Sequence, residues 1–312
     1  MRSLKLTISE IKSLSFIANH GRVSASDIAK ELDALPPQAS RIVAGLKEND
    51  LITTEKVGLS KVVSLSETKH ASLFRKLAIE YAHIPLYELL SGPSLEVLSA
   101  ICFLQLKNRK EIAESALVSE PSVAKALEKM KQVGIVQKTG QLYSVSPRFN
   151  TLREFAVEFR RYLNQKIALG FASDAVVLWE CNIEFIIESA RLEEEKGFRL
   201  TGISMFGSFG IPLIVPKSHF FYSPLIKQLR LEDIIIHSIL VADHHMMPIL
   251  LIWRKNQSKI DSKYLQEQAE KYSAKDSVNG ITAYFASEGL ERAAGFPPWS
   301  EFLTKAKEYG LQ

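Results

Sequence analysis

Polar and basic side chains gather on the outward side of one predicted helix in the first third of the chain. Apolar Ala39, Val43 and Leu46 recur at helical spacing and define an inward face. The side chains left outward are those of Gln38, Ser40, Arg41 and Lys47. Glutamine and serine can hydrogen-bond base edges, and arginine can bind guanine or a phosphate, whereas lysine neutralises phosphate without reading sequence. These residue types indicate contact with DNA.

Further basic residues follow this helix and recur later in the chain. Lys56 and Lys61 lie in two β runs on either side of Gly58, where we expect them to contact phosphates. The later set, again outward on a predicted helix and its following β run, consists of Ser122, Lys125, Lys129 and Lys138. An ordinary solvated helix face is the alternative interpretation of both sets.

The two sets belong to an internal repeat. A shift of 84 residues aligns segments 11–52 and 95–136 without gaps. The aligned apolar pairs include Leu14 with Leu98, Ile17 with Ile101, Ile28-Ala29 with Ile112-Ala113, and Leu51-Ile52 with Ile135-Val136. The match is one of pattern more than of identity, which indicates one structural module used twice.

Each copy predicts the same order of elements. The first copy reads as a helix over Thr7–His20, a short helix from Ser24 or Ser26, a third helix with Pro37 in its first turn, and β runs over Leu51–Val57 and Lys61–Leu65. The second copy reads as helices over Ser94–Leu106, Arg109–Ala116 and Pro121–Gln132 and a hairpin of Ile135–Lys138 and Gln141–Val145. Gly58 and Gly140 supply the positive φ that a hairpin turn needs.

This order is that of the winged helix-turn-helix, and the first half of the chain resembles the MarR-like and related winged-helix regulators of bacteria and archaea. The carrying residues are Ser40-Arg41-Ile42-Val43, Leu46-Lys47-Glu48, Leu51-Ile52, Ser122-Val123-Ala124-Lys125-Ala126-Leu127 and Gly134-Ile135-Val136. The first copy departs at Asp50, where the family usually has Gly; Asp tolerates the left-handed conformation better than most residues. The resemblance implies double-stranded DNA in contact with the third helix. It leaves open the operator and whether both copies bind DNA, because winged helices also bind proteins.

Two further helices are expected around the second copy. Glu67–Tyr87 reads as a connecting helix that ends before Pro85. Asn150–Phe171 reads as an amphipathic helix with Phe155 and Phe159 on its apolar side. In winged-helix regulators such helices often pair two subunits, so a homodimer is one expectation, and packing on the same chain is the other.

The pattern past about residue 172 changes to mixed α and β. Expected strands are Ala175–Trp179, Phe185–Ile187 and His219–Tyr222; expected helices are Leu200–Phe209, Leu231–Ala242, Asp261–Lys271 and Trp299–Tyr309; Met247–Trp253 fits either. Within this region Met205-Phe206-Gly207-Ser208 resembles the Gly-Ser turn of nucleotidyltransferases. That chemistry needs paired carboxylates for Mg²⁺, yet no Asp or Glu occurs between Phe209 and Leu231.

The C-terminal region also resembles the C-terminal domain of AbiEi-type abortive-infection antitoxins and their archaeal relatives. The carrying residues are the run Phe198-Arg199-Leu200-Thr201-Gly202-Ile203-Ser204-Met205-Phe206-Gly207, then Leu231-Glu232-Asp233 and Ile234–Leu240. The resemblance implies a domain that engages a nucleotidyltransferase toxin or modulates repression. The doubled winged helix departs from the single one usual in that family.

Composition sets outer bounds on these interpretations. The chain has 312 residues and a net charge of +4, and residues 1–150 hold 20 Lys and Arg against 15 Asp and Glu, an excess of +5. That bias is compatible with nucleic-acid binding. Cys102 and Cys181 stand alone in apolar runs, which excludes a zinc cage built from cysteines and indicates a reducing cytoplasm. Asp243, His244 and His245 read as a turn before Pro248 and not as a metal site.

Together these observations predict an α+β protein of four parts. They are a winged helix-turn-helix with a connecting helix (1–84), a second one (85–148), a linker or dimerisation helix (149–171), and a mixed α/β domain (172–312). The expected function is DNA-binding transcription regulation with a C-terminal sensing or partner-binding domain, without catalysis, cofactor, metal or membrane. An antitoxin-like protein that binds a toxin is the alternative, and a nucleotidyltransferase-type enzyme is a further one.

Overall fold

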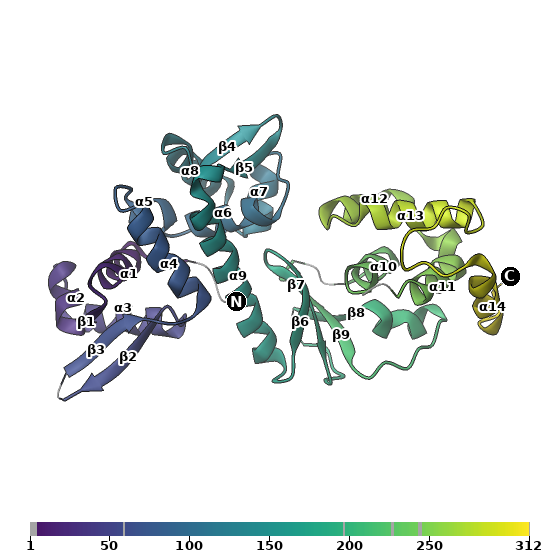
Figure 1. Ribbon diagram of the computed structural model, residues 1–312, viewed down its shortest axis with the longest axis horizontal. Helices are drawn as coiled ribbons and strands as arrows, with labels where there is room; N and C mark the ends of the chain where they lie inside the picture. Colours follow the sequence, from purple (N-terminus) through teal and green to yellow (C-terminus); the bar gives the residue numbers. More distant parts are fainter. Residues whose placement is uncertain (1–4, 59, 196, 226–227, 243–244, 312) are drawn as a thin grey trace. The chain divides into compact units, whose positions relative to one another are not determined.

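The protein is a mixture of helices and strands, seen in a computed structural model that describes residues 5–58, 60–195, 197–225, 228–242 and 245–311 (Figure 1). It divides into two compact units, Met1–Leu163 and Asn164–Gln312. The division falls within one helix, α9 (Asn150–Phe171), whose bounds are those expected from its periodicity. None of the described helices combines the length and apolar character that crossing a bilayer requires.

The first module of the first unit follows the expected order. Its elements are α1 (Ile8–His20), β1 (Arg22–Ser24), α2 (Ala25–Glu31), α3 (Pro36–Glu48), β2 (Ile52–Val57) and β3 (Ser60–Leu65). Thr7 and Ser24 cap α1 and α2 through capping boxes, which explains why the helices begin there. The three-residue β1 is too short to show a period in sequence; it completes an antiparallel sheet of order β1-β3-β2.

The second module repeats this plan. Its elements are α6 (Ser94–Phe103), α7 (Arg109–Ala116), α8 (Glu120–Gln132), β4 (Val136–Thr139) and β5 (Leu142–Val145). The bounds of α8 equal those of α3 plus 84 residues. In place of a strand like β1, one backbone hydrogen bond of 3.0 Å joins the N–H of Tyr143 to the carbonyl of Leu106.

The same two turns in each module use left-handed backbone. Asp33 and Leu117, 84 residues apart, have φ of 48° and 53°. Asp50 and Gly134, also 84 residues apart, have φ of 47° and 78°. The expectation that Asp50 takes the conformation usually given to glycine is therefore confirmed.

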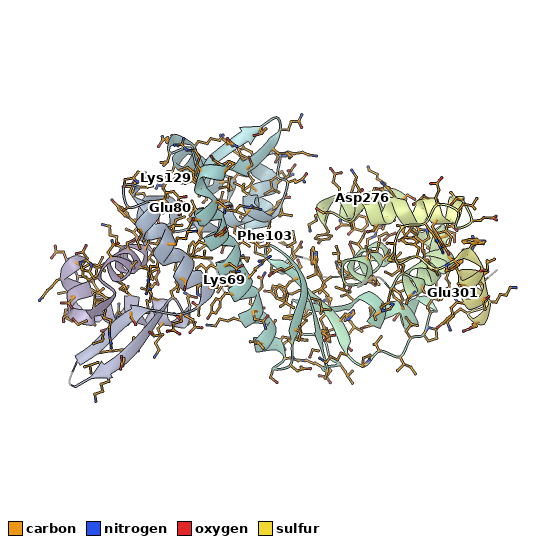
Figure 2. All side chains as sticks on the ribbon, viewed as in Figure 1. Lys69, Glu80, Phe103, Lys129, Asp276 and Glu301 are labelled. Carbon is orange, nitrogen blue, oxygen red and sulfur yellow. The ribbon has the colours of Figure 1, made fainter. Side chains whose placement is uncertain are left out.

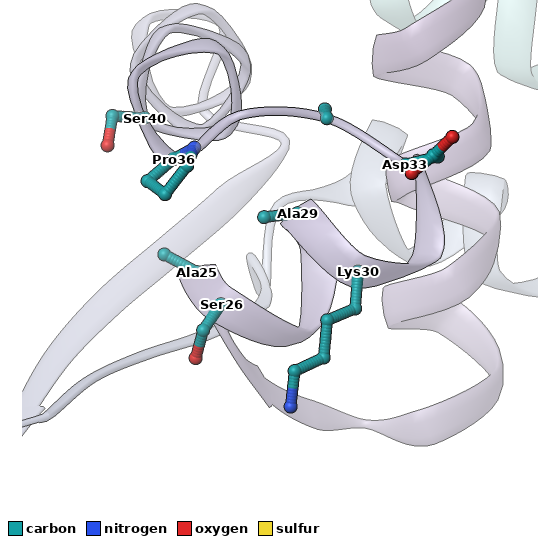
Figure 3. Close-up of a pocket in the computed structure, with 8 residues that line it drawn as sticks. Ala25, Ser26, Ala29, Lys30, Asp33, Pro36 and Ser40 are labelled. Atoms are coloured by element: carbon teal, nitrogen blue, oxygen red, sulfur yellow. The ribbon is translucent and has the colours of Figure 1, made fainter.

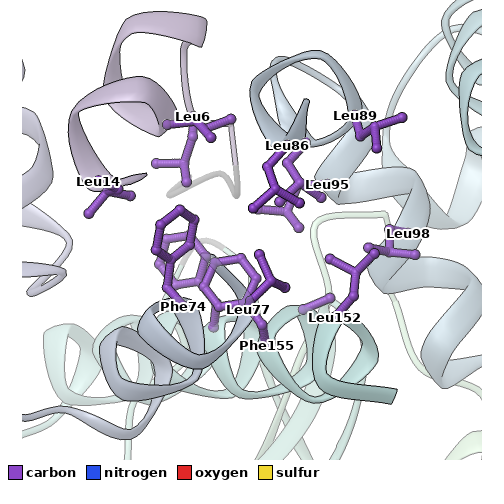
Figure 4. Packing of buried hydrophobic residues seen from close by; sticks show 14 of the residues in the cluster. Leu6, Leu14, Phe74, Leu77, Leu86, Leu89, Leu95, Leu98, Leu152 and Phe155 are labelled. Carbon is purple, nitrogen blue, oxygen red and sulfur yellow. The ribbon is translucent and has the colours of Figure 1, made fainter. Parts of the chain in front are cut away.

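One hydrophobic core runs through both modules (Figure 4). The helices that fill it between the modules are α4 (Lys69–Glu80), α5 (Leu86–Leu90) and the first part of α9. The expected connecting helix over Glu67–Tyr87 is two helices, because α4 ends at Glu80 and α5 starts after Pro85. Phe155 and Phe159 are fully buried against the same chain, which is the second of the two expectations for the amphipathic helix.

The second unit contains an antiparallel sheet of order β6-β7-β9-β8. Its strands are β6 (Val176–Cys181), β7 (Glu184–Ser189), β8 (Phe198–Thr201) and β9 (Ser218–Tyr222). Ala168 and Phe171 of α9 pack on one face of it, beside Phe185 and Phe220. The expected helix over Leu200–Phe209 is wrong in its first part: the chain is strand to Thr201 and then a 3₁₀-helix, η2 (Gly202–Phe209).

Helices make up the rest of the second unit. They are α10 (Leu231–Leu240), α11 (Met247–Asn256), the 3₁₀ turn η3 (Gln257–Lys259), α12 (Ser262–Lys271), α13 (Lys275–Ala286) and α14 (Trp299–Glu308); the 3₁₀ turn η1 (Pro147–Phe149) precedes α9 in the first unit. The apolar run Met247–Trp253, which fitted strand or helix, is helical. Helix α13 was not anticipated, because Asn279 and Gly280 interrupt its apolar pattern and it starts without a side-chain cap.

Candidate nucleic-acid interface

The outer face of α3 carries the first predicted set of residues. Ala39, Val43 and Leu46 are buried, and Gln38, Ser40, Arg41 and Lys47 are all exposed. The Oε1 atom of Gln38 accepts a hydrogen bond of 3.1 Å from the backbone N–H of Leu35, so this side chain also caps the helix. Helix α3 packs against α1, α2 and β2, which leaves this face outward within its module.

The β2–β3 hairpin brings its two lysines together. Lys56 lies directly opposite Lys61. The two side chains are on the same face of the hairpin as Ile52 and Val63, which are buried nearer the core. Both lysines are exposed. Like charges directly opposite each other destabilise an antiparallel pair. A partner with negative charge would relieve this repulsion.

A shallow depression of about 440 Å³ lies between α2 and α3 (Figure 3). Alanine and proline carbons form much of its lining, and Ser26, Lys30 and Ser40 add polar groups. Asp33 lies at the far end from Ser40, so its charge offsets that of Lys30 within the depression. The depression therefore provides space beside Ser40 without net charge.

The C-terminal end of α3 is held by polar contacts with α4 and α9. The Nε2 atom of His70 lies 3.0 Å from the carbonyl of Asn49, and the His70 ring lies 5.2 Å from that of Phe159 in α9. The hydroxyl of Tyr162 donates a hydrogen bond to the carboxylate of Asp50.

The capping box at the start of α2 is charged. Hydrogen bonds from the hydroxyl and N–H of Ser24 hold the pKa of Asp27 below its ordinary value, so this carboxylate is ionised at neutral pH.

The predicted residues of the second module divide between two surroundings. Lys125 and Lys138 are exposed, and Ser122 is half-buried with its hydroxyl 2.9 Å from that of Ser119. Lys129 is turned towards α5, where its Nζ donates to the carbonyl of Glu88 at 3.2 Å (Figure 2). Lys129 lies one turn after Lys125 on α8, and its contact with α5 distinguishes it from Lys125 and Lys138, which are exposed.

Other basic residues of the second module were not anticipated from the sequence. Lys131 is exposed and occupies the position equivalent to Lys47, and its Nζ lies 5.0 Å from the centre of the Tyr143 ring. The Nζ of Lys138 lies 5.2 Å from the same ring. Lys107, Arg109 and Lys110 are exposed around the start of α7. The repeat offset would have found Lys131, and the count of eight Lys and Arg against four Asp and Glu in residues 101–150 would have found the others.

The second unit places the residues of the nucleotidyltransferase resemblance in different surroundings. Ser208 is exposed in η2, whereas Glu232 and Asp233 are buried. Asp233 accepts hydrogen bonds of 2.8 Å from both the N–H of Arg230 and the hydroxyl of Tyr264. Glu232 accepts one of 2.7 Å from the N–H of Asp261. These carboxylates act as links between α10 and α12.

A buried polar network joins the sheet of the second unit to α12 and the residues after it. Glu184 accepts hydrogen bonds of 3.0 Å from the hydroxyls of Tyr272 and Ser223, and Lys271 lies 2.8 Å from its carboxylate. Burial raises the pKa of Tyr272, so the phenol stays protonated. Burial also lowers the pKa of the neighbouring His237 to about 3, which keeps this histidine neutral at pH 7.

Metal ligands were not expected, and Asp243 and His244 lie outside the described residues. Among the residues that are described, no group of three or more His, Cys, Asp or Glu side chains is arranged to hold a metal ion. Burial raises the pKa of the Cys102 and Cys181 thiols to about 12, so neither is a ready thiolate ligand or nucleophile.

Comparison with known proteins gives a match for the C-terminal part of the chain. No curated protein and no solved structure matches the chain. Residues 195–311 match a protein-family model described as HVO_2833_C, C-terminal, so this C-terminal stretch, which covers β8 to α14, is similar to that family.

Proposed function

We propose that the protein is a DNA-binding transcription regulator in which both modules of the first unit are winged helix-turn-helix domains. Helices α3 and α8 would enter the major groove, and the β2–β3 and β4–β5 hairpins would contact the backbone beside it. Gln38, Ser40 and Arg41 would meet base edges, and the lysines would neutralise phosphates.

The observation that carries the proposal is the pairing of an exposed polar helix with a hairpin that holds two lysines opposite each other. Arg41 stands on the outer face of α3, and Lys56 and Lys61 stand opposite one another in the hairpin that follows it. Two like charges directly opposite each other do not stabilise the hairpin. Binding of both lysines to a polyanion would explain why they are placed there.

The second unit has a separate role in this proposal, as a sensing or partner-binding domain. Its buried carboxylates Glu184, Glu232 and Asp233 are occupied in hydrogen bonds between elements of the unit itself. Such a network stabilises the fold of the second unit. In this proposal the unit therefore recognises its ligand or partner through its surface. The partner class, including a toxin, is a question for co-purification with the product of the adjacent gene.

Gel shift and fluorescence anisotropy with DNA from upstream of the gene test the proposal. We expect binding whose logarithmic affinity falls linearly with the logarithm of salt concentration, because phosphate binding releases counterions. The double variant Arg41→Ala/Lys125→Ala removes one outward cation from each module. Its slope should fall by about 1 for each phosphate that the variant no longer neutralises.

Lys307→Ala is the matched control, because Lys307 is an exposed helical lysine of the second unit. This variant should bind DNA with the affinity and salt slope of the unaltered protein. Tight binding retained by Arg41→Ala/Lys125→Ala would count against the proposal, and so would affinity that does not change with salt.

A further inference from the structure

We propose that the first unit binds two DNA duplexes at once, one on each module, so that a single chain bridges two DNA segments. This inference rests on the proposed DNA binding and goes further, because it concerns the number and placement of the duplexes. Its evidence is the way in which the two modules are joined and the directions in which their hairpins extend.

The two modules are parts of one packed body. The shared core includes Leu14 of α1, Leu98 of α6 and Phe155 of α9 (Figure 4). Polar contacts join further segments: the hydroxyl of Tyr81, at the end of α4, donates to the carbonyl of Arg148 in η1 at 2.8 Å, and Leu6, before α1, forms a bridge with Ser91, after α5. A close-packed interior resists sliding of its parts. The modules therefore cannot turn independently to follow one duplex.

The candidate DNA faces lie away from this junction. Helix α3 packs mainly on α1, α2 and β2, and α8 packs mainly on α6 and α7, with smaller contacts to α5 and β4. Helices α4, α5 and the first part of α9 fill the core between the modules. In Figure 1 the β2–β3 hairpin extends towards the lower left and the β4–β5 hairpin towards the upper right. In this view the two hairpins extend to opposite sides of the common core.

A straight duplex cannot serve both hairpins in this arrangement. DNA has a persistence length of about 50 nm, so it would have to bend sharply to pass from one side of the unit to the other. Each face has its own cations for a separate duplex. The exposed cations of the first module include Arg41, Lys56 and Lys61; those of the second include Arg109, Lys110, Lys125, Lys131 and Lys138.

A bridging assay with the full-length chain tests the inference. Two duplexes of about 20 base pairs, two helical turns each, are mixed with the protein at low salt, where binding without sequence preference is strong. One duplex carries biotin and the other a fluorophore. Protein on streptavidin beads with the first duplex should retain the second, and native mass spectrometry should find two duplexes on one chain.

Two double variants separate the faces. Lys56→Ala/Lys61→Ala weakens the first face and Arg109→Ala/Lys110→Ala the second; both pairs are exposed, so folding should be unaffected, which circular dichroism checks. Each variant should still bind one duplex by anisotropy, but the retained fluorescence should fall about tenfold, because fewer phosphates are neutralised on the weakened face. Lys307→Ala should retain the second duplex as the unaltered protein does.

The possible results have distinct meanings. Binding of one duplex without retention of a second overturns bridging and leaves the proposed function intact. Full retention by Arg109→Ala/Lys110→Ala also overturns it, because the bridge would then come from two chains that each use the first face. A chain that binds no duplex at any salt concentration overturns the proposed function as well.

Discussion

The two modules of the first unit share a backbone plan and differ in their surfaces. Helices α3 and α8 have the same length and the same bounds at the 84-residue offset, and the turns at Asp33 and Leu117 share a left-handed residue. Yet the first hairpin is longer and holds two lysines opposite each other, whereas the second is short and has Lys138 opposite Tyr143. Equivalent positions thus keep conformation while their chemistry changes.

The difference teaches that the core sets the repeat and the neighbours of each module set its surface. Position 12 in α1 and position 96 in α6 are equivalent, but Lys12 is exposed and Glu96 is buried beside Arg160 of α9. Helix α6 lies among α5, α7 and α8 and is buried along most of its length, whereas the outer side of α1 faces solvent. The following changes test equivalent positions or the contacts that distinguish the two modules.

The largest effect is expected at Arg160. Arg160→Met leaves the Glu96 carboxylate buried without this guanidinium, which should lower the free energy of unfolding of the first unit by about 3–5 kcal/mol. Lys12→Met, at the equivalent of position 96, should cost less than about 1 kcal/mol, since it removes an exposed contact with the Tyr87 ring.

Two probes of urea unfolding locate this effect. Trp179, Trp253 and Trp299 all belong to the second unit, so tryptophan fluorescence follows that unit while circular dichroism follows both. Arg160→Met should shift the circular-dichroism transition and leave the fluorescence transition in place. Equal losses of stability in Arg160→Met and Lys12→Met would show that positions 12 and 96 do not differ in the way described.

The sequence was sufficient where a period or a turn residue carries the information. Periodicity placed α3, α8 and α9 closely, and Gly58 and Gly140 marked both hairpin turns. It was insufficient where tertiary packing decides. The direction of Lys129 depends on α5, a helix of five residues that periodicity merged with α4. For the same reason the sequence could not show that the two hairpins point apart.

An intermediate effect is expected at the left-handed turn after each third helix. Gly134→Ala should lower the free energy of unfolding by about 1 kcal/mol, because alanine disfavours φ of 78°. The cost should not be larger, since a Cβ at position 134 would meet no other atom. Gly134→Asp, which copies the residue of the first module, should cost less. If Gly134→Ala were neutral in urea unfolding, the turn would have relaxed and its likeness to the turn at Asp50 would be coincidental.

The smallest effect is expected at the hairpins, and there its sign differs between the modules. Lys61→Thr removes a like charge opposite Lys56 and should raise the free energy of unfolding by about 0.2–1 kcal/mol at low salt, with less gain at high salt. Lys138→Thr removes a cation near the Tyr143 ring and should lower it by about 0.5–1 kcal/mol. Both should weaken DNA binding if both hairpins contact phosphates.

Thermal unfolding and fluorescence anisotropy on the same samples measure the stability and the DNA affinity of each variant. Because Lys61→Thr should gain stability while its affinity falls, a variant in which both decreased would mean that Lys61 supports the fold and that the lysine pair is no evidence for a polyanionic partner.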